Sequence, residues 1–152
     1  IKALEGLISN VLQLHEEDFK SLLETRSILE IQAARLAAER ATDEEIKDIR
    51  KAHHDFLERV ENSESGLDED LLFHLRVAKY SQNSVLHSLI ALITPDILRM
   101  SNTRNTCTGG RNREALKEHE KIISAIADHD PDHAEAAMQY HQDQTLEIVQ
   151  EK

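Results

Sequence analysis

The segment LDEDLLFHLRVA, residues 67–78, is the stretch that decides how this chain folds. Its inward stripe has a spacing of three or four positions and consists of Leu67, Asp70, Leu71, His74, Val77 and Ala78. This spacing predicts an amphipathic helix with one face against a core. Asp70 and His74 lie on the same stripe, four residues apart, so their side chains rise from one face of the helix. Two polar side chains thus stand where a core is expected to be apolar.

Two distant histidines, His119 and His141, repeat this pattern on their own predicted helices. The apolar residues on their stripes are Leu116, Ile122, Ile123 and Ile126 for the first and Ala134, Ala137, Met138 and Ile148 for the second. Burying a polar side chain without a partner costs roughly 2 to 7 kcal/mol. A shared divalent cation would satisfy all four polar side chains together.

Two interpretations of these four residues stay open from spacing alone. Each histidine could be hydrogen-bonded to a neighbouring backbone or carboxylate group, as most buried polar groups are. Alternatively, Asp70, His74, His119 and His141 could hold one metal ion, with positions left for water or a ligand. Donors of this kind favour Zn²⁺ first, and they also accept Ni²⁺, Mn²⁺, Fe²⁺ or Co²⁺.

The composition predicts a single all-helical domain over residues 1–152. Only four Gly and two Pro interrupt the chain, and aromatic residues make up 3% of it. The 29 acidic and 18 basic residues give a formal charge of −11, which repels phosphate backbones. We therefore expect this segment not to bind DNA or RNA by itself.

The cellular compartment is indicated by cysteine usage and hydropathy. The single cysteine, Cys107, rules out an internal disulfide and fits a reducing compartment. No apolar run approaches the roughly 20 residues of a membrane span, and no signal-peptide pattern is present. These features predict a cytoplasmic protein that does not enter a membrane. Because the chain begins at Ile1 without methionine, we expect it to be a piece of a longer protein.

The other helices are predicted from apolar spacing and from residues that begin or end a helix. In all, helices are expected over about residues 4–12, 18–40, 43–60, 67–80, 85–94, 113–127 and 131–150. Thr42 and Glu45 form a capping-box pattern, and Asn83 is placed to cap the helix that follows it. Pro95 is expected to kink or break that helix after Thr94, and residues 101–112 are expected to form a loop or frayed helix end.

Two of these helices carry further expectations. The wide apolar surface of residues 85–93 predicts a central position or a contact between subunits. His53 and His54 have no carboxylate or histidine at metal-ligand spacing, so we expect them at the surface or the edge of the core.

Arg26 is another polar residue on an inward stripe, within the helix over 18–40. It could form an ion pair with Glu30, four residues later. Alternatively, its planar guanidinium could meet the carboxylate of a small ligand in the cavity that the metal lines.

Motifs of helical metalloenzymes are missing from the sequence. The H-E-x-x-H motif fails because Ile123 stands where its second histidine belongs, and none of the nine histidines follows a glutamate by three residues. Cys107 has no inward histidine beside it in sequence, so the sequence does not support nucleophilic catalysis by this cysteine. We expect no catalytic residues and no enzyme activity. A metal-dependent enzyme acting on a small organic acid, and a purely structural helical module, remain as alternatives.

Four separated motifs, in order, resemble one known family. ETRSILE at 24–30 and AARLAAERAT at 33–42 resemble the R-x-x-L-E and A-x-x-L-A-A-x-R-A-T signature of the FCD domain. DLLFH at 70–74 and SQN at 81–83 match its D-x-x-F-H and S-x-N pattern. The segments 118–126 and 130–141 match its E-H-x-x-I-x-x-A-I and D-x-x-x-A-x-x-x-M-x-x-H ending. The FCD domain is the C-terminal effector-binding domain of the FadR subfamily of GntR transcriptional regulators.

This resemblance implies an antiparallel bundle of six or seven helices around a ligand cavity with a divalent metal. It implies that Asp70, His74, His119 and His141 are the metal ligands, and that Arg26 and Asn83 contact a small carboxylate effector, an organic acid or a sugar acid. The resemblance also implies a homodimer. DNA would be bound only through an N-terminal winged-helix domain that this chain lacks.

Overall fold

The computed structural model describes residues 15–104 and 109–151 of the chain, and the described part is entirely helical. Its elements are the 3₁₀-helix η2 (Glu16–Asp18) and the α-helices α2 (Phe19–Arg40), α3 (Asp43–Glu61), α4 (Leu67–Tyr80), α5 (Ser84–Arg104), α6 (Gly109–Ala127) and α7 (Pro131–Glu151). The predicted all-α class is therefore confirmed. The helix expected over 4–12 and the residue Cys107 lie outside the described ranges.

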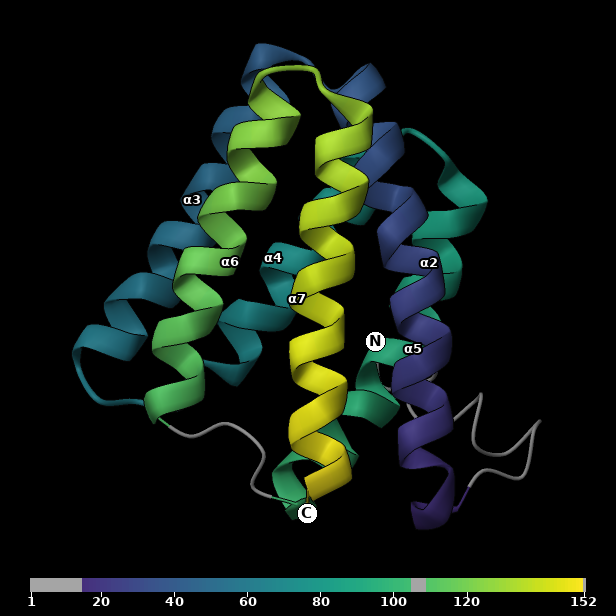
Figure 1. The fold of residues 1–152 in the computed structure, drawn as a ribbon, viewed down its shortest axis with the longest axis vertical. Helices are drawn as coiled ribbons and strands as arrows, with labels where there is room; N and C mark the ends of the chain where they lie inside the picture. Colours follow the sequence, from purple (N-terminus) through teal and green to yellow (C-terminus); the bar gives the residue numbers. More distant parts are fainter. Residues whose placement is uncertain (1–14, 105–108, 152) are drawn as a thin grey trace.

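The helices pack together as a bundle, and a short turn reverses the chain between α6 and α7 (Figure 1). Helix α2 packs along α7, α6 also packs along α7, and α3 packs against α4 and α6. Helix α4 contacts α2, α3 and α5, so the segment that carries Asp70 and His74 lies inside the bundle. None of the helices in the described ranges is long and apolar enough to cross a membrane.

The largest core cluster joins five helices around α4. Its buried members include Ile31 from α2, Ile49 from α3, Phe73 from α4, Ile122 from α6 and Met138 from α7. Each comes from an apolar stripe with helical spacing, and burial of such side chains provides roughly 1.5 to 3 kcal/mol apiece. This cluster fixes the rotation of the helices that carry the polar candidates.

The helix ends use the residues that the sequence offers for capping. Thr42 and Glu45 form the expected capping box at the start of α3, with both reciprocal hydrogen bonds present. The side chain of Asn83 accepts a hydrogen bond from the backbone N–H of Leu86 at the start of α5, as expected. Gly66 precedes α4 with a φ of 67°, a left-handed conformation that glycine adopts without steric cost.

Pro95 does not end α5, and the expected break after Thr94 is wrong. The helix continues through Pro95 to Arg104, although an internal proline costs about 3 kcal/mol. Ile93 and Ile97, on either side of it, are buried in a core cluster with Met100, and this burial offsets the lost hydrogen bond.

Of the two alternatives expected over 101–112, the helix end fits the described residues better than the loop, because α5 reaches Arg104 and α6 begins at Gly109. Two side-chain contacts anchor the first turn of α6. Arg111 pairs with Glu118, and the side chain of Asn112 donates to the carbonyl of Ser65.

His53 also departs from expectation, since it is only 8% exposed. Its ring lies 5.9 Å from that of Phe73 and 5.4 Å from that of His119, measured between centroids. The face of α3 that carries Phe56 turns it into the core. His54, the next residue, is exposed as expected.

Candidate metal centre

The four side chains singled out in the sequence come together in the bundle. Asp70 and His74 extend from α4, His119 from α6 and His141 from α7, and one ligand atom from each lies within 4.8 Å of the others. The three histidines are buried. The i, i+4 spacing on α4 supplies half of the cluster, and the packing of α6 and α7 supplies the rest.

The distances within the cluster are those of donor atoms around one point. His119 Nε2 lies 3.1 Å and His74 Nε2 lies 3.4 Å from the same oxygen, Asp70 Oδ1. His141 Nε2 lies 3.2 Å from His74 Nε2. Donors bound to one ion at about 2.0 to 2.2 Å stand roughly 2.8 to 3.1 Å from their neighbours in octahedral geometry and roughly 3.3 to 3.6 Å in tetrahedral geometry. These three distances fall between about 2.8 and 3.6 Å, and the remaining pairs of ligand atoms are at most 4.8 Å apart.

Buried polar atoms without hydrogen bonds provide a second test of whether the cluster fits a metal ion. Within the described ranges, Asp70 Oδ1 and His119 Nε2 are buried and make no hydrogen bond of acceptable geometry, although they lie 3.1 Å apart. Leaving such atoms unsatisfied costs about 1 to 3 kcal/mol each. One carboxylate oxygen and three imidazole nitrogens are ligands that Zn²⁺ and its neighbours accept. The residues present therefore fit a divalent transition metal.

The pKa shifts of His119 and His141 also suit metal binding. Burial lowers the pKa of His119 well below its usual value and lowers the pKa of His141, so both rings are neutral and keep a free lone pair. Burial by itself would raise the pKa of Asp70, but the neighbouring side chains of His119 and His74 together outweigh burial and hold that pKa well below its usual value. Burial alone would lower the pKa of His74, but the carboxylates of Glu30 and Asp70 together outweigh burial and raise that pKa.

Two glutamates contact the outer nitrogens of the cluster. His74 Nδ1 lies 2.5 Å from Glu30 Oε1, and His141 Nδ1 lies 2.6 Å from Glu118 Oε1. Both glutamates are buried. Sequence reasoning treated Glu30 only as a partner for Arg26 and missed Glu118. A signal existed, since Glu118 shares an inward stripe with Ala115 and Ile122 on α6.

Two arginines hold these glutamates. Arg26 is 5% exposed and forms an ion pair with Glu30, which confirms the i, i+4 pair considered from the sequence. Arg111 contacts both carboxylate oxygens of Glu118, at 2.8 and 3.0 Å, and donates to the hydroxyl of Thr145. Arg111 was not singled out in the sequence, because it lies at the edge of the stretch interpreted as a loop.

The two effector-contact candidates lie in different places. Arg26 lies at the cluster through Glu30, and within the described ranges its Nη2 atom is buried without a hydrogen-bond partner. Asn83 lies on the exposed turn between α4 and α5, where its side chain caps α5. The structure thus brings Arg26 to the metal candidates and places Asn83 at a helix end.

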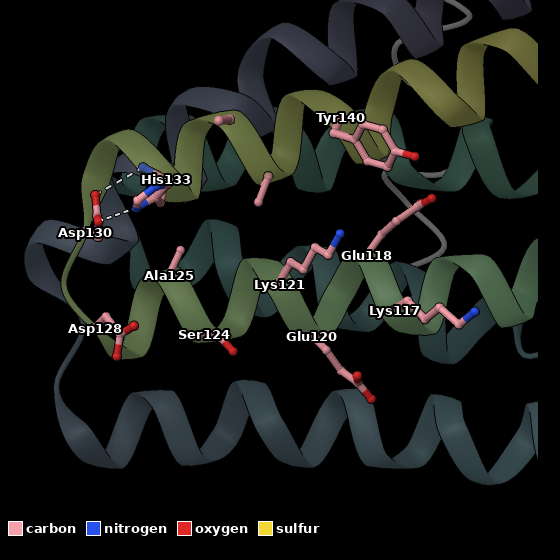
Figure 2. A pocket seen from close by; sticks show the side chains of 12 residues that line it. Lys117, Glu118, Glu120, Lys121, Ser124, Ala125, Asp128, Asp130, His133 and Tyr140 are labelled. Carbon is pink, nitrogen blue, oxygen red and sulfur yellow. Dashed lines mark hydrogen bonds and ion pairs between the residues drawn. The ribbon is translucent and has the colours of Figure 1, made fainter.

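A surface groove lies between α6 and α7 (Figure 2). Its volume is about 840 Å³, and Lys117, Lys121 and Tyr140 are among its lining residues. None of the four cluster residues lines it, but Glu118 does, so that carboxylate separates the groove from His141. The groove is lined by four carboxylates and two lysines, and this mixture of charges selects no particular class of ligand.

Fold and site together define a class: an all-helical domain that gathers one aspartate and three histidines from three helices around a common centre. The family model of the FCD domain matches residues 21–144, and the chain belongs to this family.

Curated relatives are named as regulators. The HTH-type transcriptional regulator LutR of Bacillus subtilis is 35% identical over 138 residues, covering 88% of this chain and 63% of that protein. The HTH-type transcriptional repressor NanR of Escherichia coli is 28% identical over 142 residues, covering 93% of this chain and 54% of that protein. This chain thus spans little more than half the length of these relatives.

Two solved structures share the fold. Streptococcus agalactiae GntR superposes with a TM-score of 0.72 at 30% identity, covering 85% of this chain and 58% of that one. E. coli McbR/YncC superposes with a TM-score of 0.77 at 16% identity, covering 90% of this chain and 66% of that one. The second likeness concerns the fold alone.

Proposed function

We propose that this chain is the ligand-sensing domain of a GntR-family transcriptional regulator of the FadR subfamily. Its ligand is a small carboxylate, an organic acid or a sugar acid, bound at a divalent metal. The observation that carries this proposal is the convergence of Asp70, His74, His119 and His141 inside a domain of the FCD family. Zn²⁺ is our first choice, and Ni²⁺, Mn²⁺, Fe²⁺ and Co²⁺ suit the same donors.

The charges around the cluster support an anionic ligand. Three carboxylates, from Asp70, Glu30 and Glu118, stand against the guanidinium groups of Arg26 and Arg111. With neutral histidines the site carries one net negative charge, and a divalent ion changes this to one net positive charge. An acid would neutralise that charge, and the ion, when bound, would supply open positions for its oxygen atoms.

Arg26 supports the same ligand class. Its Nη2 atom is buried and lacks an acceptor within the described ranges, whereas another part of the same guanidinium is paired with Glu30. A ligand carboxylate would provide the missing acceptor with a charge-assisted hydrogen bond. We propose Arg26 as the effector contact and keep Asn83 as a weaker candidate, because its side chain already caps α5.

Signalling would then depend on a dimer and on a further domain. Val85 and Leu89 of α5 are 68% and 44% exposed, and apolar side chains this exposed suit a contact between two copies. An N-terminal winged-helix domain would bind DNA, since this segment carries a charge of −11. Effector binding would favour one arrangement of the bundles over another and so change DNA binding in the cytoplasm.

Elemental analysis and a thermal-shift screen test the proposal. We expect about one metal ion per chain in the purified protein and a melting temperature that rises with one class of small organic or sugar acid. The rise should disappear after exhaustive chelation, and the Arg26→Lys variant, which loses the planar fork of donors, should show a smaller rise. Protein without metal, or an acid response that chelation leaves unchanged, would contradict the proposal.

A further inference from the structure

Two of the cluster histidines, His74 and His141, orient their two ring nitrogens in the same way. His74 and His141 each direct Nε2 toward the centre of the cluster and Nδ1 toward a buried glutamate. A carboxylate accepts hydrogen bonds and cannot donate them. The ring nitrogen beside it must therefore carry a proton, and when the ring is neutral its Nε2 lone pair faces the centre of the cluster.

The glutamates are themselves held in place by arginines. Arg26 pairs with Glu30, and Arg111 contacts both oxygens of Glu118. The two chains of contacts, Arg26–Glu30–His74 and Arg111–Glu118–His141, start from different helices and end at the same centre. Since each glutamate is fixed from behind, it limits the rotation of its histidine ring as well as its tautomer.

His119 provides an internal contrast. Within the described ranges its Nδ1 atom has no hydrogen-bond partner, and its ring stacks on Phe73 with centroids 4.0 Å apart and an angle of 17° between the planes. Its orientation is set by packing on an aromatic ring. Two of the three histidines are thus positioned by carboxylates and one by an apolar contact.

We propose that Glu30 and Glu118 are positioning residues that set the affinity of the metal site through His74 and His141. Each would fix the Nδ1–H tautomer, orient the ring and increase the basicity of Nε2 toward the ion. Partners of this kind typically change metal affinity by about 10- to 100-fold. This inference rests on the metal site proposed above.

Zinc affinity of glutamine variants tests the inference. Titration against a chromophoric chelator gives the Kd of Zn²⁺ for the wild type, Glu30→Gln and Glu118→Gln. We expect the Kd of each variant to rise by about 10- to 100-fold. Glu24→Gln and Glu114→Gln are matched controls, because they remove the same charge from exposed positions on α2 and α6 and should leave the Kd unchanged. Circular dichroism of each metal-free variant checks that it folds.

Ring-nitrogen NMR of the Zn²⁺-loaded protein separates positioning from a general structural role. We expect Nδ1 of His74 and His141 to carry a proton that exchanges slowly with solvent. Glu118→Leu, which removes the acceptor, should expose only the His141 proton to exchange. If Glu30→Gln fails to fold, the Glu118 variants still decide the outcome. Glu118 and its partner Arg111 are more exposed than Glu30, so a substitution there disturbs the core less.

The outcomes distinguish the two proposals. Weaker zinc binding by folded variants, together with altered exchange at the matching histidine, supports the positioning role. A wild type that binds zinc with the same Kd as both folded variants overturns this inference and leaves the sensor proposal intact. A wild type that binds no zinc overturns both.

Discussion

His74 and His141 face each other through their Nε2 atoms, which lie 3.2 Å apart although 67 positions separate the residues in the chain. Their rings are nearly parallel, at an angle of 10°. With both Nδ1 protons donated to glutamates, two lone pairs point at one another. Such an arrangement is unfavourable unless a cation or a proton lies between the nitrogens, so the geometry links folding stability to metal binding.

The first prediction is that metal removal destabilises the fold. We expect exhaustive chelation to lower the melting temperature and added Zn²⁺ to restore it, because an ion that binds only the folded state stabilises it. The gain is about 2.7 kcal/mol when free metal is 100 times its Kd. Differential scanning calorimetry at several free Zn²⁺ concentrations measures the effect. A melting temperature that stays constant across these concentrations would indicate that the three histidines are buried core residues that do not bind a metal.

The second prediction concerns a single ligand. His119→Ala should sharply reduce the zinc bound per chain, since His119 Nε2 stands 3.1 Å from Asp70 Oδ1 and its loss opens one side of the cluster. His133→Ala is the matched control, because that histidine is exposed and pairs with Asp130 outside the cluster. Elemental analysis of dialysed protein gives the stoichiometry. Equal zinc content in both variants would remove His119 from the ligand set.

Parts of the site could be predicted from sequence because they follow from the helical repeat. Asp70 and His74 share a face through i, i+4 spacing, and the apolar stripes around His119 and His141 turn these residues inward. Glu118 and Arg111 could not be assigned a role in this way. Which partner each meets depends on the rotation of α6 against α7, which distant core residues such as Ile122 determine.

At Pro95, local sequence rules predict a feature that the fold does not have. Local rules predict a break, since proline removes a backbone donor from the helix. The helix persists because Ile93, Ile97 and Met100 are buried against residues far away in sequence. His53 was misplaced for a related reason, because its burial depends on rings contributed by α4 and α6.

The third prediction is a pH dependence far from the cluster. The hydroxyl of Tyr80 donates to Asp48 Oδ2, and this hydrogen bond raises the pKa of Tyr80 to about 12. An unfolded tyrosine has a pKa of about 10. Because the folded pKa is the higher one, the stabilisation is complete below about pH 10 and is lost as the pH rises toward 12. The difference in urea midpoint between the wild type and Tyr80→Phe should shrink over that window. A difference that stays constant through pH 11 would contradict this role.

The fourth prediction concerns the turn that sets the start of α4. Gly66→Ala should destabilise the metal-free protein, because the φ of 67° places the backbone in the left-handed region, which costs a side-chain-bearing residue about 1 to 2 kcal/mol. A Cβ atom there would also lie 2.9 Å from Cδ1 of the buried Phe56. Urea denaturation measures the loss in free energy of unfolding.

Ser63 provides a control of opposite sign in the same turn. It has a φ of 59° and already bears a side chain, so Ser63→Gly should leave stability unchanged or raise it by up to about 1 kcal/mol. The two substitutions are close in sequence and exchange a single small group, but only the one at position 66 adds an atom against Phe56. Similar losses in both variants would show that the turn is sensitive to any change. A loss confined to Gly66→Ala would show that glycine is required there to begin the helix that carries Asp70 and His74.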